Sequence, residues 1–212
     1  MEEAIRIRER LGEGEVVVVT VGDAEAEAVL RRCLAMGADR AIRVDGEPLD
    51  PEPLDPVSTA RALAGVVAAE SPELVLAGVQ SADSVQGSTG VALAELLGLP
   101  RVAVVTHLDW SGSGPATVSR ELEGGLVDIV EVDTPAVLTI QTGINEPRYA
   151  NLRAIKQAEQ HEIGVVGAES GEPAYRVRRM FSPPRGSGAE MLDGDPAQVA
   201  QRILELVRER LA

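Results

Sequence analysis

The stretch LVLAGVQSADSVQGSTGVALAELLG, residues 74–98, decides the fold of this chain. It opens with an apolar run typical of a strand, passes through the small polar residues SADSVQGSTG, and ends in an amphipathic run typical of a helix. A strand, a small-residue loop and a helix in this order are the layout in which a helix N-terminus binds phosphate. Unpaired backbone N–H groups and the helix dipole attract the anion, and small side chains let it approach the backbone.

The loop offers backbone donors but little side-chain chemistry. It has no GxxxxGK[ST] motif, so no lysine neutralises a terminal phosphate, and it has no GxGxxG dinucleotide motif. A mononucleotide held by backbone groups therefore fits better than hydrolysis of a nucleoside triphosphate. An ordinary strand–helix loop is the alternative that these residues leave open. The residues placed to meet a phosphate are Gly87, Ser88, Thr89 and Gly90.

Strand and helix patterns alternate on both sides of this loop. Continuous apolar runs at 15–22 and 74–79 predict strands buried on both faces, and the segments between them have helical periodicity. From about residue 105, strand patterns follow one another directly. This order predicts a doubly wound, mostly parallel sheet between two layers of helices, extended by antiparallel strands at one edge. A little-patterned arm over 167–195 and a helix over 196–211, capped by Asp195, complete the chain.

Composition and charge exclude several classes of protein. Among 212 residues 44% are hydrophobic but only 2% aromatic, so the core must consist of Val, Leu, Ile and Ala. A net charge of −14 disfavours binding to nucleic acid. Cys33 is the only cysteine, and neither His107 nor His161 lies in a metal-binding motif, so we expect no metal. The absence of a signal peptide and of a run of about 20 apolar residues predicts a cytoplasmic protein without membrane insertion.

A second informative region lies within residues 118–149. In VSRELEGGLVDIVEVDTPAVLT (118–139) the residues Glu123–Gly125 predict a hairpin turn, and Pro135 precedes a further strand. In INEPRY (144–149) the charges of Glu146 and Arg148 beside a proline suggest a loop fixed by charge pairing.

Taken together these segments resemble the β subunit of electron transfer flavoproteins over nearly the whole chain. The 74–98 stretch looks like that family's AMP-binding loop and helix, VSRELEGG with TPAVLT looks like its signature hairpin, and INEPRYANLRAIKQA looks like the approach to its recognition loop. The resemblance implies the adenine-nucleotide alpha-hydrolase-like form of the three-layer α/β fold. It also implies a nucleotide-binding domain over 1–166 and an arm and helix over 167–212 that pack on the partner subunit.

The resemblance further implies an electron carrier subunit rather than an enzyme. Such a subunit binds AMP, or a second FAD in flavin-bifurcating members, and shares the redox-active FAD with an α subunit. Its expected partners are that α subunit, acyl-CoA or related dehydrogenases of fatty acid oxidation, and a quinone oxidoreductase. A stand-alone adenine-nucleotide-binding protein of the universal-stress type is the third possibility, but it needs neither the hairpin nor the arm.

The family's binding residues transfer by motif. Phosphate contacts fall on the backbone of the 87–90 segment, and the loop that docks partner dehydrogenases is anchored at Leu152, with Ile155 beside it. The contacts on the adenosine side fall on Val21, Val79, Ser81 and Asp83.

The sequence departs from the family in three places. An additional strand and loop that normally precede the first helix are not in the sequence, and we expect a misassigned start codon or a truncation. Asp128 stands where the signature usually has Glu or Gln. The run RAIKQAEQHEI after Leu152 is less rich in lysine than in many members, so the docking chemistry is expected to differ.

Overall fold

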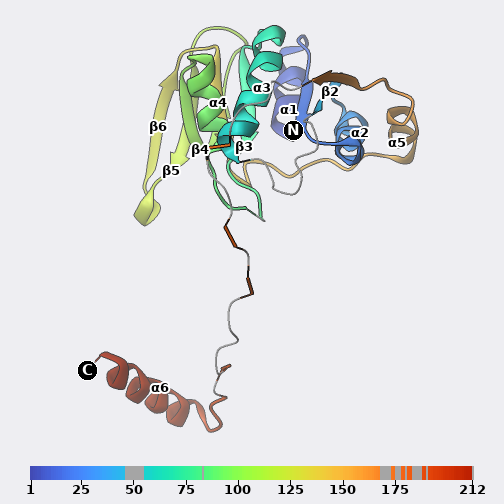
Figure 1. Ribbon diagram of the computed structural model, residues 1–212. Coiled ribbons are helices and arrows are strands. Elements are labelled where there is room, and N and C mark those ends of the chain that lie inside the picture. Colours follow the sequence, from blue (N-terminus) through green and yellow to red (C-terminus); the bar gives the residue numbers. More distant parts are fainter. Residues whose placement is uncertain are drawn as a thin grey trace. The chain divides into compact units, whose positions relative to one another are not determined.

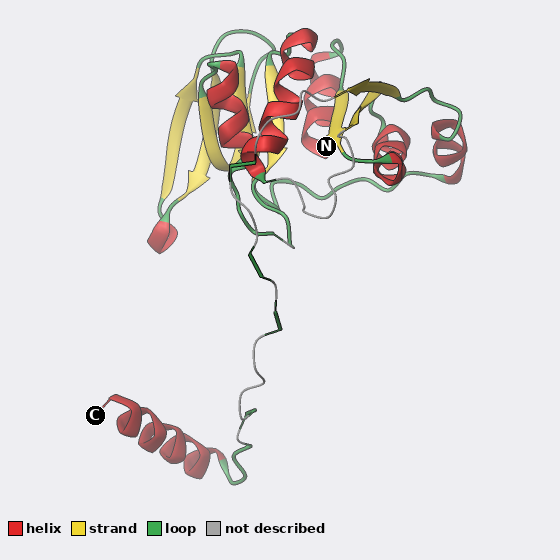
Figure 2. Ribbon diagram, viewed as in Figure 1, coloured by secondary structure: helices red, strands yellow, loops and turns green. Residues whose placement is uncertain are grey.

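The computed structural model describes residues 1–45, 55–82, 84–167, 173–174, 178–179, 181–182, 188–189 and 191–211. The chain divides into two compact units, Met1–Arg176 and Val177–Ala212. The first unit consists of sheets flanked by helices, which confirms the expected α/β fold class (Figures 1 and 2). In the second unit the described residues include one long helix, α6 (Pro196–Leu211).

The strands of the first unit lie in two sheets (Figure 2). The larger sheet has the strand order β3-β7-β4-β5-β6, and the smaller one has the order β1-β2-β8. In chain order the strands are β1 (Val17–Val21), β2 (Arg40–Asp45), β3 (Leu74–Gly78), β4 (Arg101–Asp109), β5 (Ala116–Glu121), β6 (Val127–Val132), β7 (Ala136–Ile140) and β8 (Gly164–Gly167).

Parallel pairing gives way to antiparallel pairing along the larger sheet, as the sequence predicted. β3, β7 and β4 are parallel neighbours, whereas β4, β5 and β6 pair antiparallel. The turn between β5 and β6 uses Gly124 and Gly125 at positive φ, 77° and 74°, so the predicted hairpin turn is confirmed. The smaller sheet is parallel throughout.

The expected helices are present with bounds close to those predicted. They are α1 (Glu2–Leu11), α2 (Glu27–Met36) after a short 3₁₀ turn, α3 (Pro56–Glu70) and α4 (Thr89–Leu97), with α6 in the second unit. Asp195 caps α6 through the backbone N–H groups of Ala197 and Gln198. No helix in the described ranges has the length and apolar character needed to cross a membrane. Two elements were not expected, α5 (Leu152–Ala158) and β8, because polar residues interrupt the pattern after Gln141.

Helix α1 joins the two sheets. Ile7 and Leu11 pack into the core of the larger sheet with residues such as Val105 and Leu138. Met1 and Ala4, on the preceding turns, pack into the core formed by α2 and the smaller sheet. A single amphipathic helix therefore contributes to both cores and fixes the frame from which the later loops are held.

The prediction that the first and third strands are buried on both faces was wrong. Every residue of β1 and all but the last of β3 are only half-buried, whereas Ala136–Thr139 of β7 are fully buried. The reason is position in the sheet: in the described residues β1 pairs with β2 alone, and β3 pairs with β7 alone. Each is an edge strand, so one flank of its apolar side chains lacks a neighbouring strand.

Candidate functional site

The loop between β3 and α4 leaves the helix N-terminus without a cap. Ser88 occupies the N-cap position, yet its side chain makes no capping hydrogen bond. Within the part of the chain that the structure describes, the N–H groups of Thr89, Gly90 and Val91 have no hydrogen-bond acceptor. Three donors at the positive end of a helix dipole thus remain available beside an exposed loop. Binding of a phosphate group by these donors stays a prediction.

Glycine occupies positions 87 and 90 of the loop for two different structural reasons. Gly87 has φ +60°, a conformation that side-chain-bearing residues rarely adopt, and it lies exposed on the loop. Gly90 is buried, and a Cβ placed there would lie 2.7 Å from Cγ2 of Thr139 and 3.2 Å from Cβ of Ala77. Close packing of α4 on the sheet therefore accounts for Gly90. A ligand contact through its backbone stays a prediction.

The structure describes three of the four residues that were predicted to contact the adenosine side of the nucleotide. Val79 extends the β3–β7 ladder, because its N–H donates to the carbonyl of Ile140. The Ser81 hydroxyl lies 2.8 Å from that of Ser84, and the Ser81 carbonyl accepts from Val85, so Ser81 shapes a turn of the loop. Val21 ends β1 in the smaller sheet, and Asp83 lies outside the described residues.

A feature that sequence reasoning missed lies beneath the α4 N-terminus. Thr139 on β7 is 3% exposed, and its Oγ1 accepts a hydrogen bond from the N–H of Val104. Val104 has φ +61° at a break in the register of β4, which is an unusual conformation for a β-branched residue. The signal in the sequence was a single threonine in the apolar run AVLTI. Such backbone irregularities recur near ligand sites at the ends of strands.

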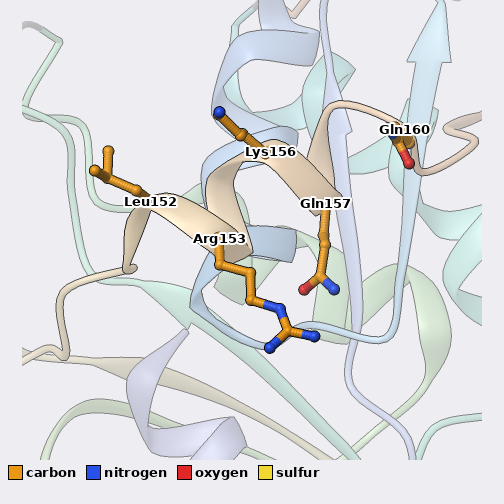
Figure 3. A pocket seen from close by; sticks show the side chains of 5 residues that line it. All are labelled: Leu152, Arg153, Lys156, Gln157 and Gln160. Carbon is orange, nitrogen blue, oxygen red and sulfur yellow. The ribbon is translucent and has the colours of Figure 1, made fainter.

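The second candidate surface is centred on α5. Tyr149, Leu152 and Ile155 are 97%, 80% and 42% exposed, so three large apolar side chains lie on this short segment. Figure 3 shows Leu152 extending from the start of the helix, with Arg153 and Gln157 on a common side of it. The residues Leu152 and Ile155, predicted as the docking pair, are thus presented to solvent.

Ion pairs hold the segment before α5 against α1. Arg148 donates to both carboxylate oxygens of Glu2, at 2.9 and 3.0 Å from Nε and Nη2, and to both oxygens of Glu9. Asn145 donates to Glu3, and Arg6 donates to the carbonyl of Glu146. The predicted fixing of this loop by charge is confirmed, but the partners of Arg148 are on α1, which the sequence did not indicate.

The Glu2 carboxylate is the buried centre of this network. It is 5% exposed, and its pKa is lowered from 4.5 to about 2 because Arg148 donates hydrogen bonds to the ionised form; burial opposes this effect, and Arg6 adds to it. A group whose folded pKa lies below its unfolded value stabilises the fold above the unfolded value, and that stabilisation is lost as pH falls.

Helix α5 is also fixed at both of its ends. The Asn151 side chain accepts a hydrogen bond from the N–H of Ala154 and caps the N-terminus. From α2, Arg31 donates to the carbonyls of Ala158, Glu159 and His161 at the C-terminal end. A groove runs between the two helices and is lined by residues that include Arg32, Met36 and Ile155. A rigidly held helix with exposed apolar side chains is the arrangement of an interface anchor.

Among the described residues, no group of three or more His, Cys, Asp or Glu side chains is arranged to hold a metal ion.

Comparisons with known proteins bear on the family of this chain. The family model described as the electron transfer flavoprotein domain matches residues 1–170. A protein named electron transfer flavoprotein subunit beta from Methylophilus methylotrophus is 42% identical, with 99% of this chain and 83% of that protein aligned. Proteins of the same name from Syntrophomonas wolfei and Bacillus subtilis are 33% and 34% identical; each alignment covers 98% of this chain, and 80% and 82% of those proteins.

Proposed function

This chain belongs to the electron transfer flavoprotein beta subunit family, and we propose that it holds an adenine nucleotide at the α4 N-terminus and docks electron-donating dehydrogenases through α5. In this proposal the chain pairs with an α subunit, and the FAD held mainly by that subunit accepts electrons and passes them on to a quinone oxidoreductase. The chain itself binds the nucleotide, helps to position the FAD and recognises the dehydrogenases.

The observation that carries the proposal is the uncapped α4 N-terminus. Thr89, Gly90 and Val91 present N–H groups without acceptors, next to a loop that contributes no cationic side chain among its described residues. Backbone donors suit the phosphate of AMP, which needs neutralisation of less charge than a triphosphate does. FAD in the same place, as in a bifurcating member, uses the same donors, because its diphosphate presents the same oxygen chemistry.

Helix α6 is proposed to pack on the partner subunit. Its residues Val199, Ile203, Leu206 and Val207 follow helical spacing along one side, and no residue of this helix is buried. A sixteen-residue helix with an uncovered apolar stripe gains its stability from packing rather than from propensity alone. Phe181 of the arm is also exposed, and the Arg179 guanidinium lies 5.0 Å from the centroid of its ring. Tyr175, Val177 and Met180, the other apolar residues of the arm, lie outside the described residues.

A charge at Ser88 tests the nucleotide site without harming the fold. The variant Ser88→Asp places a carboxylate at the helix N-terminus, where it favours α4 but repels a phosphate. Ser88→Asn is the matched neutral control. We expect the nucleotide content of the purified complex to fall at least about tenfold for the Asp variant and to change little for the Asn variant. Unchanged content in the Asp variant, with normal thermal stability, would refute the site.

A further inference from the structure

The described cations of the first unit that lack a partner lie on α5 and on the neighbouring helix α2. Among the described lysine and arginine side chains of this unit, all but three have an ion pair, a hydrogen bond or another interaction. The three described side chains without such an interaction are Arg32, Arg153 and Lys156. Arg32 lines the groove between α2 and α5, and the other two line a shallow hollow on another side of α5 (Figure 3).

This concentration is unexpected in so acidic a chain. With 34 acidic and 20 basic residues, a carboxylate is available for most cations. The neighbouring cations are indeed occupied, since Arg31 pairs with Glu27 and Arg148 pairs with Glu2 and Glu9. Of the acidic residues, Glu159 lines the same groove as Arg32. The side chains that line the groove and the hollow therefore carry more positive than negative charge, on a chain of net charge −14.

The cations lie on two sides of the apolar side chains. Ile155 shares the groove with Arg32, and Leu152 shares the hollow with Arg153 and Lys156. Among the described residues of the first unit, Tyr149 and Leu152 have the two most exposed large apolar side chains. An apolar centre with cations beside it is complementary to an apolar pocket that has carboxylates at its rim.

We propose that the docking surface extends from α5 across the groove to α2, and that Arg32, together with Arg153 and Lys156, receives carboxylates at the rim of the partner dehydrogenase's apolar pocket. This inference rests on the proposed docking role of α5 and adds to it a second helix and the partner's charge. The apolar side chains hold the complex together, while the cations raise its rate of formation.

The test compares two arginines with equal charge changes. Arg32→Gln removes one charge in the groove, and Arg101→Gln removes one at an exposed position on β4, where the arginine pairs with Glu95. Each variant is purified as the complex with its α subunit. The measured quantity is the second-order rate constant for reduction of the complex by the host's own acyl-CoA dehydrogenases, each assayed separately with its acyl-CoA, from 20 mM to about 500 mM NaCl.

We expect Arg32→Gln to lower the rate constant about three- to tenfold at low salt with at least one dehydrogenase, and the difference to vanish at high salt. Arg101→Gln should change it less than twofold, and Arg32→Lys should restore most of the rate because charge rather than shape is required. A loss that is the same for Arg32→Gln and Arg101→Gln, a loss that persists at high salt, or no loss would overturn the inference.

Leu152→Ala, measured in parallel, distinguishes a failure of the α2 contribution from a failure of the docking role of α5. If Leu152→Ala slows reduction and Arg32→Gln does not, α5 docks the partner but α2 takes no part. If neither variant slows reduction by any dehydrogenase while both complexes retain their flavin, the docking role of α5 itself is wrong, and this inference falls with it.

Discussion

Two helices of this chain expose apolar side chains, and they differ in how they are held and what surrounds them. Helix α5 has seven residues, is capped by Asn151, and is fixed by Arg31 and by the Arg148 ion pairs before it. Helix α6 has sixteen residues, and none is buried. On α6, Arg202 and Glu205 lie 3.5 Å apart as a pair.

The difference fits the two kinds of partner proposed above. A short helix that its own domain holds rigidly can be presented without a partner, which suits a complex that forms and dissociates at each electron transfer. A long amphipathic helix with an uncovered stripe suits a permanent, largely apolar interface. The predictions below test this division, beginning with the largest expected effect.

The double variant Ile203→Asp with Val207→Asp should abolish the permanent interface. Two carboxylates on the apolar stripe of α6 must be desolvated on association, so the Kd for the α subunit should rise about 100-fold or more. Gln201→Asp, on the opposite side of the same helix, is the control and should leave Kd nearly unchanged. The measurement is isothermal titration or co-purification. Equal affinity for both variants would place the subunit interface elsewhere.

Leu152→Ala should affect only the transient interface. Removing the most exposed large aliphatic anchor on α5 should lower the second-order rate constant with a partner dehydrogenase about 10- to 100-fold, while affinity for the α subunit stays constant. Ile129→Ala, which removes an exposed aliphatic side chain from β6, is the control. Dissociation of the subunits by Leu152→Ala would show that the two surfaces are not separate.

Glu2→Gln should weaken the frame that holds α5. Because the pKa of Glu2 is about 2 in the folded protein and 4.5 otherwise, its ion pair with Arg148 stabilises the fold fully above about pH 4.5. The variant should lower the free energy of unfolding by about 3 kcal/mol at pH 7. The difference from the parent should shrink as pH falls towards 2. Urea denaturation at several pH values measures both effects, and a difference that is independent of pH would contradict this account.

Asn151→Ala should give the smallest effect. Loss of the hydrogen bond to the Ala154 N–H should destabilise α5 by about 1 kcal/mol. Faster amide hydrogen exchange should be confined to the first turn of α5, and reduction by the dehydrogenase should slow only slightly, because Arg31 still holds the other end. Asn151→Asp, which retains a capping oxygen, should restore protection. Unchanged exchange in Asn151→Ala would show that the cap is dispensable.

Sequence patterns predicted what is local and missed what is distant. The strand, loop and helix at 74–98, the glycine turn at 124–125 and the Asp195 cap each follow from residues near one another in the chain. The partners of Arg148 are about 140 positions away, and Arg31 meets α5 across a similar separation, so no local pattern marks them. The half-burial of β1 and β3 was missed because an apolar run reports what a strand can bury, not which neighbours it has.

The candidate site likewise has features that the local sequence predicts and features that it does not. The uncapped α4 N-terminus was predictable because it depends on a strand, small residues and a helix in succession. The packing reason for Gly90 was not predictable, because Thr139, which would meet a side chain there, lies on β7, far from Gly90 in the sequence. The groove that Arg32 lines was also missed, because its two helices, α2 and α5, are far apart in the sequence and meet only in the folded unit.

The central claim is that this chain holds an adenine nucleotide within a flavin-containing heterodimer. The most direct measurement is to purify the chain co-expressed with its α subunit, denature the complex and quantify the released FAD and AMP. The account predicts one FAD and one AMP per heterodimer; two FAD without AMP would assign a flavin to the same donors. A stable heterodimer that releases FAD but no nucleotide beyond it would contradict the account.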